Sequence, residues 1–125
     1  MQKLQYEASW DKALPNQDRR RIEAVFQQTN SPDQQTIVFT PLWQARNYRG
    51  ELLVTVIVQN FGDSILSFHN QKIRYIEKGE ILAEHAFTIP PLIIQPQTSM
   101  PWAFIFPVKS LKQSSFKDGR LELAD

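Results

Sequence analysis

Apolar and polar residues alternate over much of the chain, which is the spacing of half-buried β-strands. Residues 1–12 show this alternation and predict a strand at the N-terminus. An aromatic ligand platform formed by Tyr6 and Trp10 is the functional alternative for the same residues. Residues 36–40 (TIVFT) are rich in β-branched side chains and predict a second strand. Residues 51–59 (ELLVTVIVQ) are apolar on both alternating sets, which predicts a central strand covered on both faces.

One segment has helical spacing instead. Residues 14–30 place Pro15 at a suitable first turn and Asn30 at a suitable stop. The apolar side chains that recur along one helix face are Ile22, Val25 and Phe26. This pattern predicts a single amphipathic helix, followed by a polar linker at residues 30–35 (NSPDQQ).

The second half of the chain again has strand patterns. Alternation on both sides of Lys78-Gly79 predicts a hairpin with the glycine at a positive φ. Residues 88–101 contain four prolines, so we expect a short edge piece and a loop that crosses between sheets. The aromatic run of residues 102–106 (WAFIF) predicts a strand whose large side chains fill the space between sheets. A last strand is expected near residues 119–123.

About seven short strands predict a mainly β protein, an immunoglobulin-like Greek-key β-sandwich with an N-terminal strand and one α-helix. A small barrel is the structural alternative. The length of 125 residues suits a single domain. Within it, residues 1–35 form a strand-and-helix appendage and residues 36–125 form the sandwich.

Composition removes several function classes. The 14 basic and 13 acidic residues nearly cancel, which disfavours nucleic acid or an anionic membrane as partner. The absence of cysteine excludes disulfides and thiolate chemistry. The sequence contains no stretch long and apolar enough for membrane insertion. If Met1 is the natural start, the polar N-terminus lacks a signal peptide, and we expect a cytoplasmic location, with the cytoplasmic face of the membrane included.

Candidate chemistry is sparse. His69 and His85 are the only histidines, and no nucleophile, phosphate-binding or zinc motif occurs, so we expect no catalytic residue, metal or cofactor. An enzyme that uses carboxylates from separate loops is the alternative. The consecutive Arg19, Arg20 and Arg21 are a candidate partner-binding surface, because arginine binds phosphates and carboxylates well. A solvated helix face is the other interpretation of this run.

Three blocks of sequence together resemble the SLAP domain, named for S-layer-associated proteins of Gram-positive bacilli. The blocks are residues 50–60 (GELLVTVIVQN), 73–87 (IRYIEKGEILAEHAF) and 98–107 (TSMPWAFIFP). The resemblance implies a fold and no catalytic residue. Its signature positions, interpreted as structural, are Gly50, Asn60, Gly79, Pro101, Trp102, Phe104, Phe106 and Pro107.

The resemblance also implies a function. Such domains are associated with accessory Sec systems, so we expect a non-catalytic binding or assembly factor that assists secretion of S-layer or other surface proteins. The expected partner is a protein, either a SecA-type motor or a surface-protein precursor. Contact is expected through an exposed sheet edge or through residues 19–21. The alternative is an exported cell-wall or carbohydrate-binding β-sandwich module.

Overall fold

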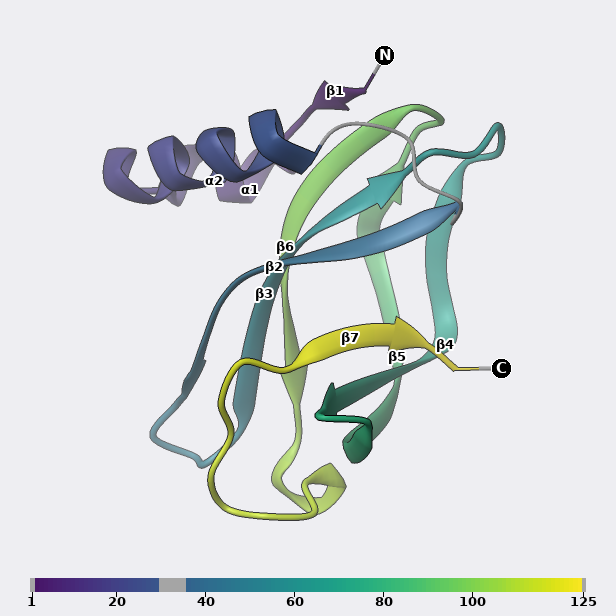
Figure 1. The fold of residues 1–125 in the computed structure, drawn as a ribbon. Helices are drawn as coiled ribbons and strands as arrows, with labels where there is room; N and C mark the ends of the chain where they lie inside the picture. Colours follow the sequence, from purple (N-terminus) through teal and green to yellow (C-terminus); the bar gives the residue numbers. More distant parts are fainter. Residues whose placement is uncertain (1, 30–35, 125) are drawn as a thin grey trace.

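The computed structural model describes residues 2–29 and 36–124, which form two packed β-sheets with two helices beside one of them (Figure 1). The elements are β1 (Lys3–Leu4), α1 (Ala8–Ala13), α2 (Asn16–Thr29), β2 (Ile37–Arg46), β3 (Leu52–Asn60), β4 (Leu66–Glu77), β5 (Glu80–Ile94), β6 (Thr98–Phe106), the 3₁₀ turn η1 (Val108–Ser110) and β7 (Arg120–Leu123). The strand orders are β1-β6-β3-β2 and β5-β4-β7. Over the described residues, the predicted mainly β sandwich of about seven strands is confirmed.

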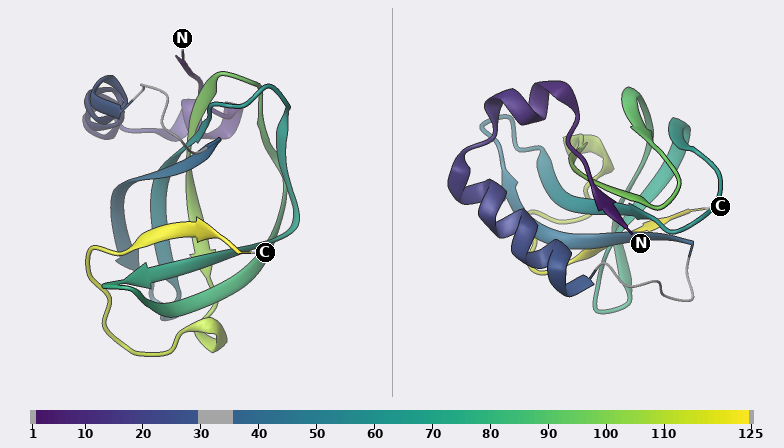
Figure 2. Two further views of the ribbon diagram at one scale, coloured as in Figure 1. Left: turned by 45° about the vertical axis from the view of Figure 1, so that its right-hand side comes forward. Right: turned by 90° about the horizontal axis from the view of Figure 1, so that it is seen from above.

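The central strand β3 is buried on both faces, as its sequence predicts. Val54, Val56 and Val58 point into the core between the two sheets. Ile57 points the other way, into a second cluster with Ile22 of α2. Each fully buried side chain of this kind stabilises the fold by roughly 1.5–3 kcal/mol. The helices therefore form a third layer over the outer face of the first sheet (Figure 2).

The aromatic run in β6 supplies the centre of the sandwich. Phe104 and Phe106 are fully buried. Phe104 meets the rings of Phe39 and Phe87 edge-on, at centroid distances of 5.8 and 5.3 Å. Trp102 packs against the same core, and its ring stacks on Trp10 of α1 at 6.1 Å. The β6 strand thus joins both hydrophobic clusters.

The N-terminal strand predicted for residues 1–12 is correct only for the two residues of β1, which pair in parallel with β6. The chain then forms the short helix α1, so the structure has two helices where one is expected. The Glu7 carboxylate accepts the backbone N–H groups of Ser9 and Trp10, which caps the start of α1. Alternating apolar residues here, Tyr6 and Trp10 among them, pack against the helix-side cluster.

The proline-rich segment is more regular than expected. β5 continues through Pro90 and Pro91 to Ile94, and a three-residue connection leads to β6. Both prolines lie in a bulge, because the pairing with β4 jumps from Ile89 to Ile93. β5 is also at the edge of its sheet, where a residue without an N–H is tolerated.

The strand order matches part of an immunoglobulin fold. β2, β3 and β6 correspond to its strands A, B and E, and β5, β4 and β7 correspond to C′, C and F. In a complete immunoglobulin sandwich, strand G follows and pairs with F. Among the residues that the structure describes, β7 has no such neighbour. As far as residues 2–29 and 36–124 show, β7 is therefore an edge strand of its sheet.

Tyr75 of β4 ties the two sheets together. Its buried hydroxyl accepts a hydrogen bond from Gln44 Nε2 of β2 at 2.9 Å and donates one to Glu77 Oε2 at 2.6 Å. The Lys117 N–H donates to the same Glu77 oxygen, at 2.7 Å. Burial, together with the acceptor Glu77, raises the pKa of Tyr75 to about 12. The neutral phenol is therefore the form that the folded state favours.

We expect the stabilising effect of the Tyr75 hydroxyl to be lost at alkaline pH. The pKa rises from 10.0 to about 12 on folding, so this stability is present below pH 10 and is lost as the pH rises towards 12. At neutral pH, the free energy of unfolding of Tyr75→Phe should be about 1 kcal/mol lower than that of the unmodified chain. This gap between the two proteins should narrow above pH 10. Denaturant unfolding across this range measures the gap, with Tyr48→Phe as control because Tyr48 is 90% exposed. A gap that stays constant to pH 12 would contradict the assignment.

Candidate protein-binding site

The three consecutive arginines do not form one surface. Arg19 makes an ion pair with Asp11 at 2.9 Å and also donates to the Asp11 carbonyl oxygen at 2.9 Å. Its guanidinium lies 4.7 Å from the ring centroid of Tyr6. Burial raises the pKa of Tyr6, with Glu23 adding to this effect and Arg19 opposing it. Arg19 therefore holds α2 against α1 and the N-terminal segment.

Arg21 contacts the sheet. It donates to the carbonyl oxygen of Leu42 at 3.0 Å and lies 5.7 Å from the ring centroid of Trp43. Arg20, between them, is exposed. Arg19 and Arg21 thus make contacts within the fold, and Arg20 and Arg21 are both exposed to solvent. Of the three, Arg20 is the exposed side chain that does not take part in the contacts of Arg19 and Arg21 described above.

Arg20→Glu is consequently the cleanest test of the arginine hypothesis. We expect it to change the free energy of unfolding by less than about 0.5 kcal/mol, because the side chain is exposed. Arg21→Ala should cost about 1 kcal/mol through the lost hydrogen bond to Leu42. Chemical denaturation of both variants measures the difference. An equal loss for both variants would show that Arg20 has a structural contact as well.

The signature positions lie in turns or in the core. Gly50 and Gly79 have φ values of 82° and 81° in the turns after β2 and β4. Pro107 is the N-cap residue before η1, and its carbonyl oxygen accepts the Ser110 N–H at 2.9 Å. Pro101 lies within β6 and directs its nitrogen away from β3. The Gln5 N–H donates to the Ser99 carbonyl, and alternate residues of a strand direct their backbone groups to the same side.

Asn60 is the signature position with the most hydrogen bonds. Its side-chain amide donates to the carbonyl oxygens of Ser64, Ile94 and Gln95 at 2.9, 3.2 and 3.3 Å. Its side-chain oxygen accepts the Gly62 N–H at 3.0 Å. Asn60 thus holds the turn after β3 against the end of β5. Together with the turn and core positions above, it has a structural place in the fold.

The histidines lie in unrelated surroundings. His69 is exposed on β4. His85 of β5 packs edge-on against the ring of Phe87 at 4.8 Å, and burial, with Lys109 adding to it, lowers the pKa of His85. In residues 2–29 and 36–124, no group of three or more histidine or acidic residues is arranged to hold a metal ion. Neither helix in this part of the chain is long and apolar enough to cross a lipid bilayer.

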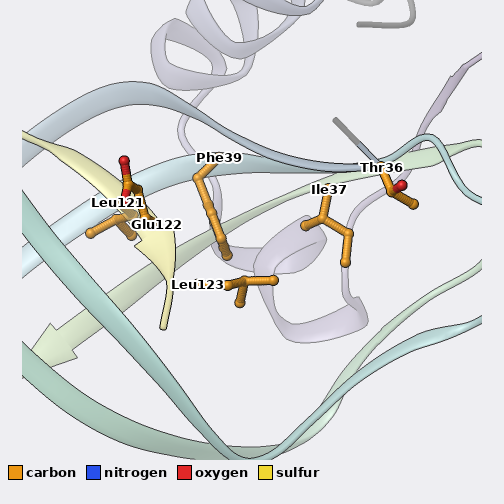
Figure 3. A pocket seen from close by; sticks show the side chains of 6 residues that line it. All are labelled: Thr36, Ile37, Phe39, Leu121, Glu122 and Leu123. Atoms are coloured by element: carbon orange, nitrogen blue, oxygen red, sulfur yellow. The ribbon is translucent and has the colours of Figure 1, made fainter. Parts of the chain in front are cut away.

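A groove of about 450 Å³ opens between β2 and β7, at the edge of the sandwich (Figure 3). The residues that line it are Thr36, Ile37, Phe39, Leu121, Glu122 and Leu123. The four apolar residues among them belong to the sandwich core or pack against it. Glu122, at the rim, forms an ion pair with Arg120 at 2.9 Å. The groove thus gives access to the core from solvent.

Unpaired backbone groups border this groove on both sides. The Phe61 N–H donates to the Thr36 carbonyl, so in the alternating ladder Ile37 and Phe39 direct their backbone groups away from β3. The Ala124 N–H donates to the Lys72 carbonyl, so Leu121 and Leu123 direct theirs away from β4. Within the described residues, β2 and β7 each pair with a strand on one side only.

The other strand edges carry features that hinder the addition of a further strand, unlike the parts of β2 and β7 that border the groove. Further along β2, Pro41 has no N–H to donate to a neighbouring strand. The Leu42 carbonyl oxygen already accepts a hydrogen bond from Arg21. β5 has its proline-containing bulge, and its start is covered where Lys112 N–H donates to the Leu82 carbonyl at 2.8 Å. β6 is paired with β1 where it begins. The groove between β2 and β7 is therefore the candidate protein-binding site.

The comparisons with known proteins identify the family. No curated protein and no solved structure matches the chain. A family model, described as the SLAP domain, matches residues 4–124. The match includes α1, α2 and all strands from β2 to β7, so the N-terminal helices are part of the family's domain. The chain therefore belongs to the SLAP domain family.

Proposed function

We propose that this chain is a non-catalytic binding and assembly factor that assists accessory Sec-dependent secretion of S-layer or other surface proteins. Membership of the SLAP domain family indicates a surface- or S-layer-associated role. The finer assignment, that the chain acts at the cytoplasmic face of the membrane with a SecA-type motor or a surface-protein precursor, is our proposal. Its role requires binding and no chemical step.

The open edges at the groove between β2 and β7 are the observation that carries this proposal. A protein segment that is not yet folded can lie extended, and an extended chain presents free backbone N–H and C=O groups. A strand edge with unpaired groups binds such a chain by adding it to the sheet. The edges of β2 and β7 offer these groups beside apolar side chains of the core.

Co-purification from the source cells tests the function. The tagged chain should retain a SecA-type motor or a surface-protein precursor, identified by mass spectrometry. Leu123→Lys, which places a charge in the groove, should reduce the amount retained. Ile105→Lys is the matched control, because Ile105 is 46% exposed on β6 and does not line the groove. Retention of neither class of protein by the unmodified chain would contradict the proposal.

A second candidate is an exported module that binds cell-wall carbohydrate. Tyr48, 90% exposed in the turn after β2 and next to the guanidinium of Arg49 at 5.5 Å, is the observation that favours it. Exposed aromatic rings provide stacking surfaces for sugars. Titration with cell-wall fragments, followed by NMR, separates the two candidates. Shifts centred on Tyr48 that disappear in Tyr48→Ala would support the carbohydrate module, whereas unchanged spectra would remove it.

A further inference from the structure

We propose that the groove between β2 and β7 binds one extended client segment as an added β-strand, and that this segment has an apolar side chain at every second position. The strand would occupy the place that strand G takes in a complete immunoglobulin sandwich. This inference deepens the proposed function, on which it rests for the identity of the client as a surface-protein precursor. The mode of binding rests on the groove itself.

The backbone geometry defines the direction of the added strand. Leu121 and Leu123 offer N–H and C=O groups along β7, and Ile37 and Phe39 offer theirs along β2. β2 and β7 run in opposite directions along the two sides of the opening (Figure 1). A segment that pairs antiparallel with β7 therefore runs parallel to β2. This is the arrangement expected of a strand that closes the sandwich.

The side chains that line the groove define the composition of the segment. Side chains of a strand alternate between the two faces of its sheet, so every second residue of the added strand would point inward. The inward positions would meet Ile37, Phe39, Leu121 and Leu123, all of which are part of or packed on the core. Valine, isoleucine or leucine at these positions removes apolar surface from water. The outward positions remain in solvent and suit threonine, serine or charged residues.

The length of β7 limits the segment. β7 has four residues, so the paired part of the client is short and matches that length. Proline is excluded where the client's N–H must face β7, because proline has no donor. The chemistry of the occupant is thus a short, proline-free, alternating apolar and polar stretch in an extended chain.

A designed peptide tests this mode of binding. The probe is a short peptide with valine at every second position and threonine or lysine between. Its control has the same side chains with N-methyl groups on the backbone nitrogens that would face β7. We expect the probe to bind and to slow hydrogen exchange at the amides of Ile37, Phe39, Leu121 and Leu123, measured by NMR. The N-methylated peptide should leave exchange unchanged.

Variants locate the site. Leu123→Lys should weaken probe binding by about tenfold to a hundredfold, as expected for the loss of one buried aliphatic contact. Ile105→Lys introduces the same charge outside the groove and should bind the probe like the unmodified chain. Circular dichroism and thermal unfolding show that both variants are folded. If Leu123→Lys does not fold, the exchange pattern in the unmodified chain decides the question.

Three results would overturn the inference. The first is equal binding of the probe and its N-methylated form, because backbone pairing would then be unnecessary. The second is protection at amides other than those of β2 and β7. The third is a concentration-dependent dimer, seen by sedimentation and abolished by Leu123→Lys, because the occupant of the groove would then be a second copy of the chain.

The same experiments separate this inference from the proposed function. If the probe binds the groove but the chain retains no motor or precursor from cells, strand addition stands and the secretion role fails. If the chain retains a precursor that Leu123→Lys binds equally well, the secretion role stands and the groove is not its site.

Discussion

Gly119→Ala is expected to destabilise the fold by about 3 kcal/mol or more, because there is no space for a side chain at this position. A Cβ atom on Gly119 would lie less than 3.0 Å from Cζ, Cε1 and Oη of Tyr75. Tyr75 is fully buried and is held by Gln44 and Glu77, so its ring has no alternative position. The free energy of unfolding, from denaturant titration, measures the loss.

Two comparisons isolate this cause. At Gly79 no atom lies within 4 Å of an added Cβ. Gly79→Ala should therefore lower the free energy of unfolding by about 1–2 kcal/mol, because alanine is strained in the left-handed backbone conformation of this position. In a Tyr75→Leu background the obstructing ring atoms are gone, and Gly119→Ala should lose most of its effect. If Gly119→Ala lowers the free energy of unfolding no more than Gly79→Ala does, the loop before β7 can move to relieve the contact with Tyr75, and the prediction is wrong.

Asn60→Asp is expected to be as damaging, although it changes the shape of the side chain very little. The amide of Asn60 donates to three carbonyl oxygens, and the residue is only 2% exposed. A carboxylate there would face three acceptors with no donor of its own. We expect a loss of roughly 3–5 kcal/mol at neutral pH, because the buried charge would have no cationic partner and would keep only the Gly62 N–H as a donor.

The pH dependence identifies the mechanism. Protonation restores a donor, so folding should raise the pKa of the new carboxyl group above its unfolded value of about 3.9. The difference in free energy of unfolding between Asn60→Asp and the unmodified chain should therefore be small below pH 4 and should grow as the pH rises. Asn70→Asp, at an exposed position, should change stability by less than about 0.5 kcal/mol. A deficit that does not vary with pH would mean that lost packing, and not charge, is the cause.

The sequence predicts the sandwich well where local patterns and tertiary contacts agree. Residues 51–59 are apolar on both sets of positions, and β3 is buried on both faces. The Lys78-Gly79 hairpin follows from turn chemistry that depends on two residues. The predictions fail where packing overrides the local pattern. Alternation in residues 1–12 predicts a strand, but the cap at Glu7 begins a helix that packs the same apolar side chains.

The sequence could predict the type of binding site, an exposed strand edge, but not its position in the fold. An exposed strand edge is a reasonable expectation for any small sandwich. Which edge is open depends on strand order, and strand order depends on contacts between residues far apart in the chain. One signal was present: residues 36–40 and 120–123 lack the prolines found near the other edges. The arginine run gave no sign that Arg19 and Arg21 are used internally.

Photo-cross-linking in the source cells tests the central claim, that the open edges of β2 and β7 receive an extended client. A photoreactive amino acid replaces Thr36, which is exposed at the groove, and in a separate variant replaces Val108, which is 51% exposed outside it. We predict a covalent product between the Thr36 position and a surface-protein precursor, and no such product from the Val108 position. Precursor products from Val108 alone, or products from Thr36 that contain only a second copy of this chain, would contradict the claim.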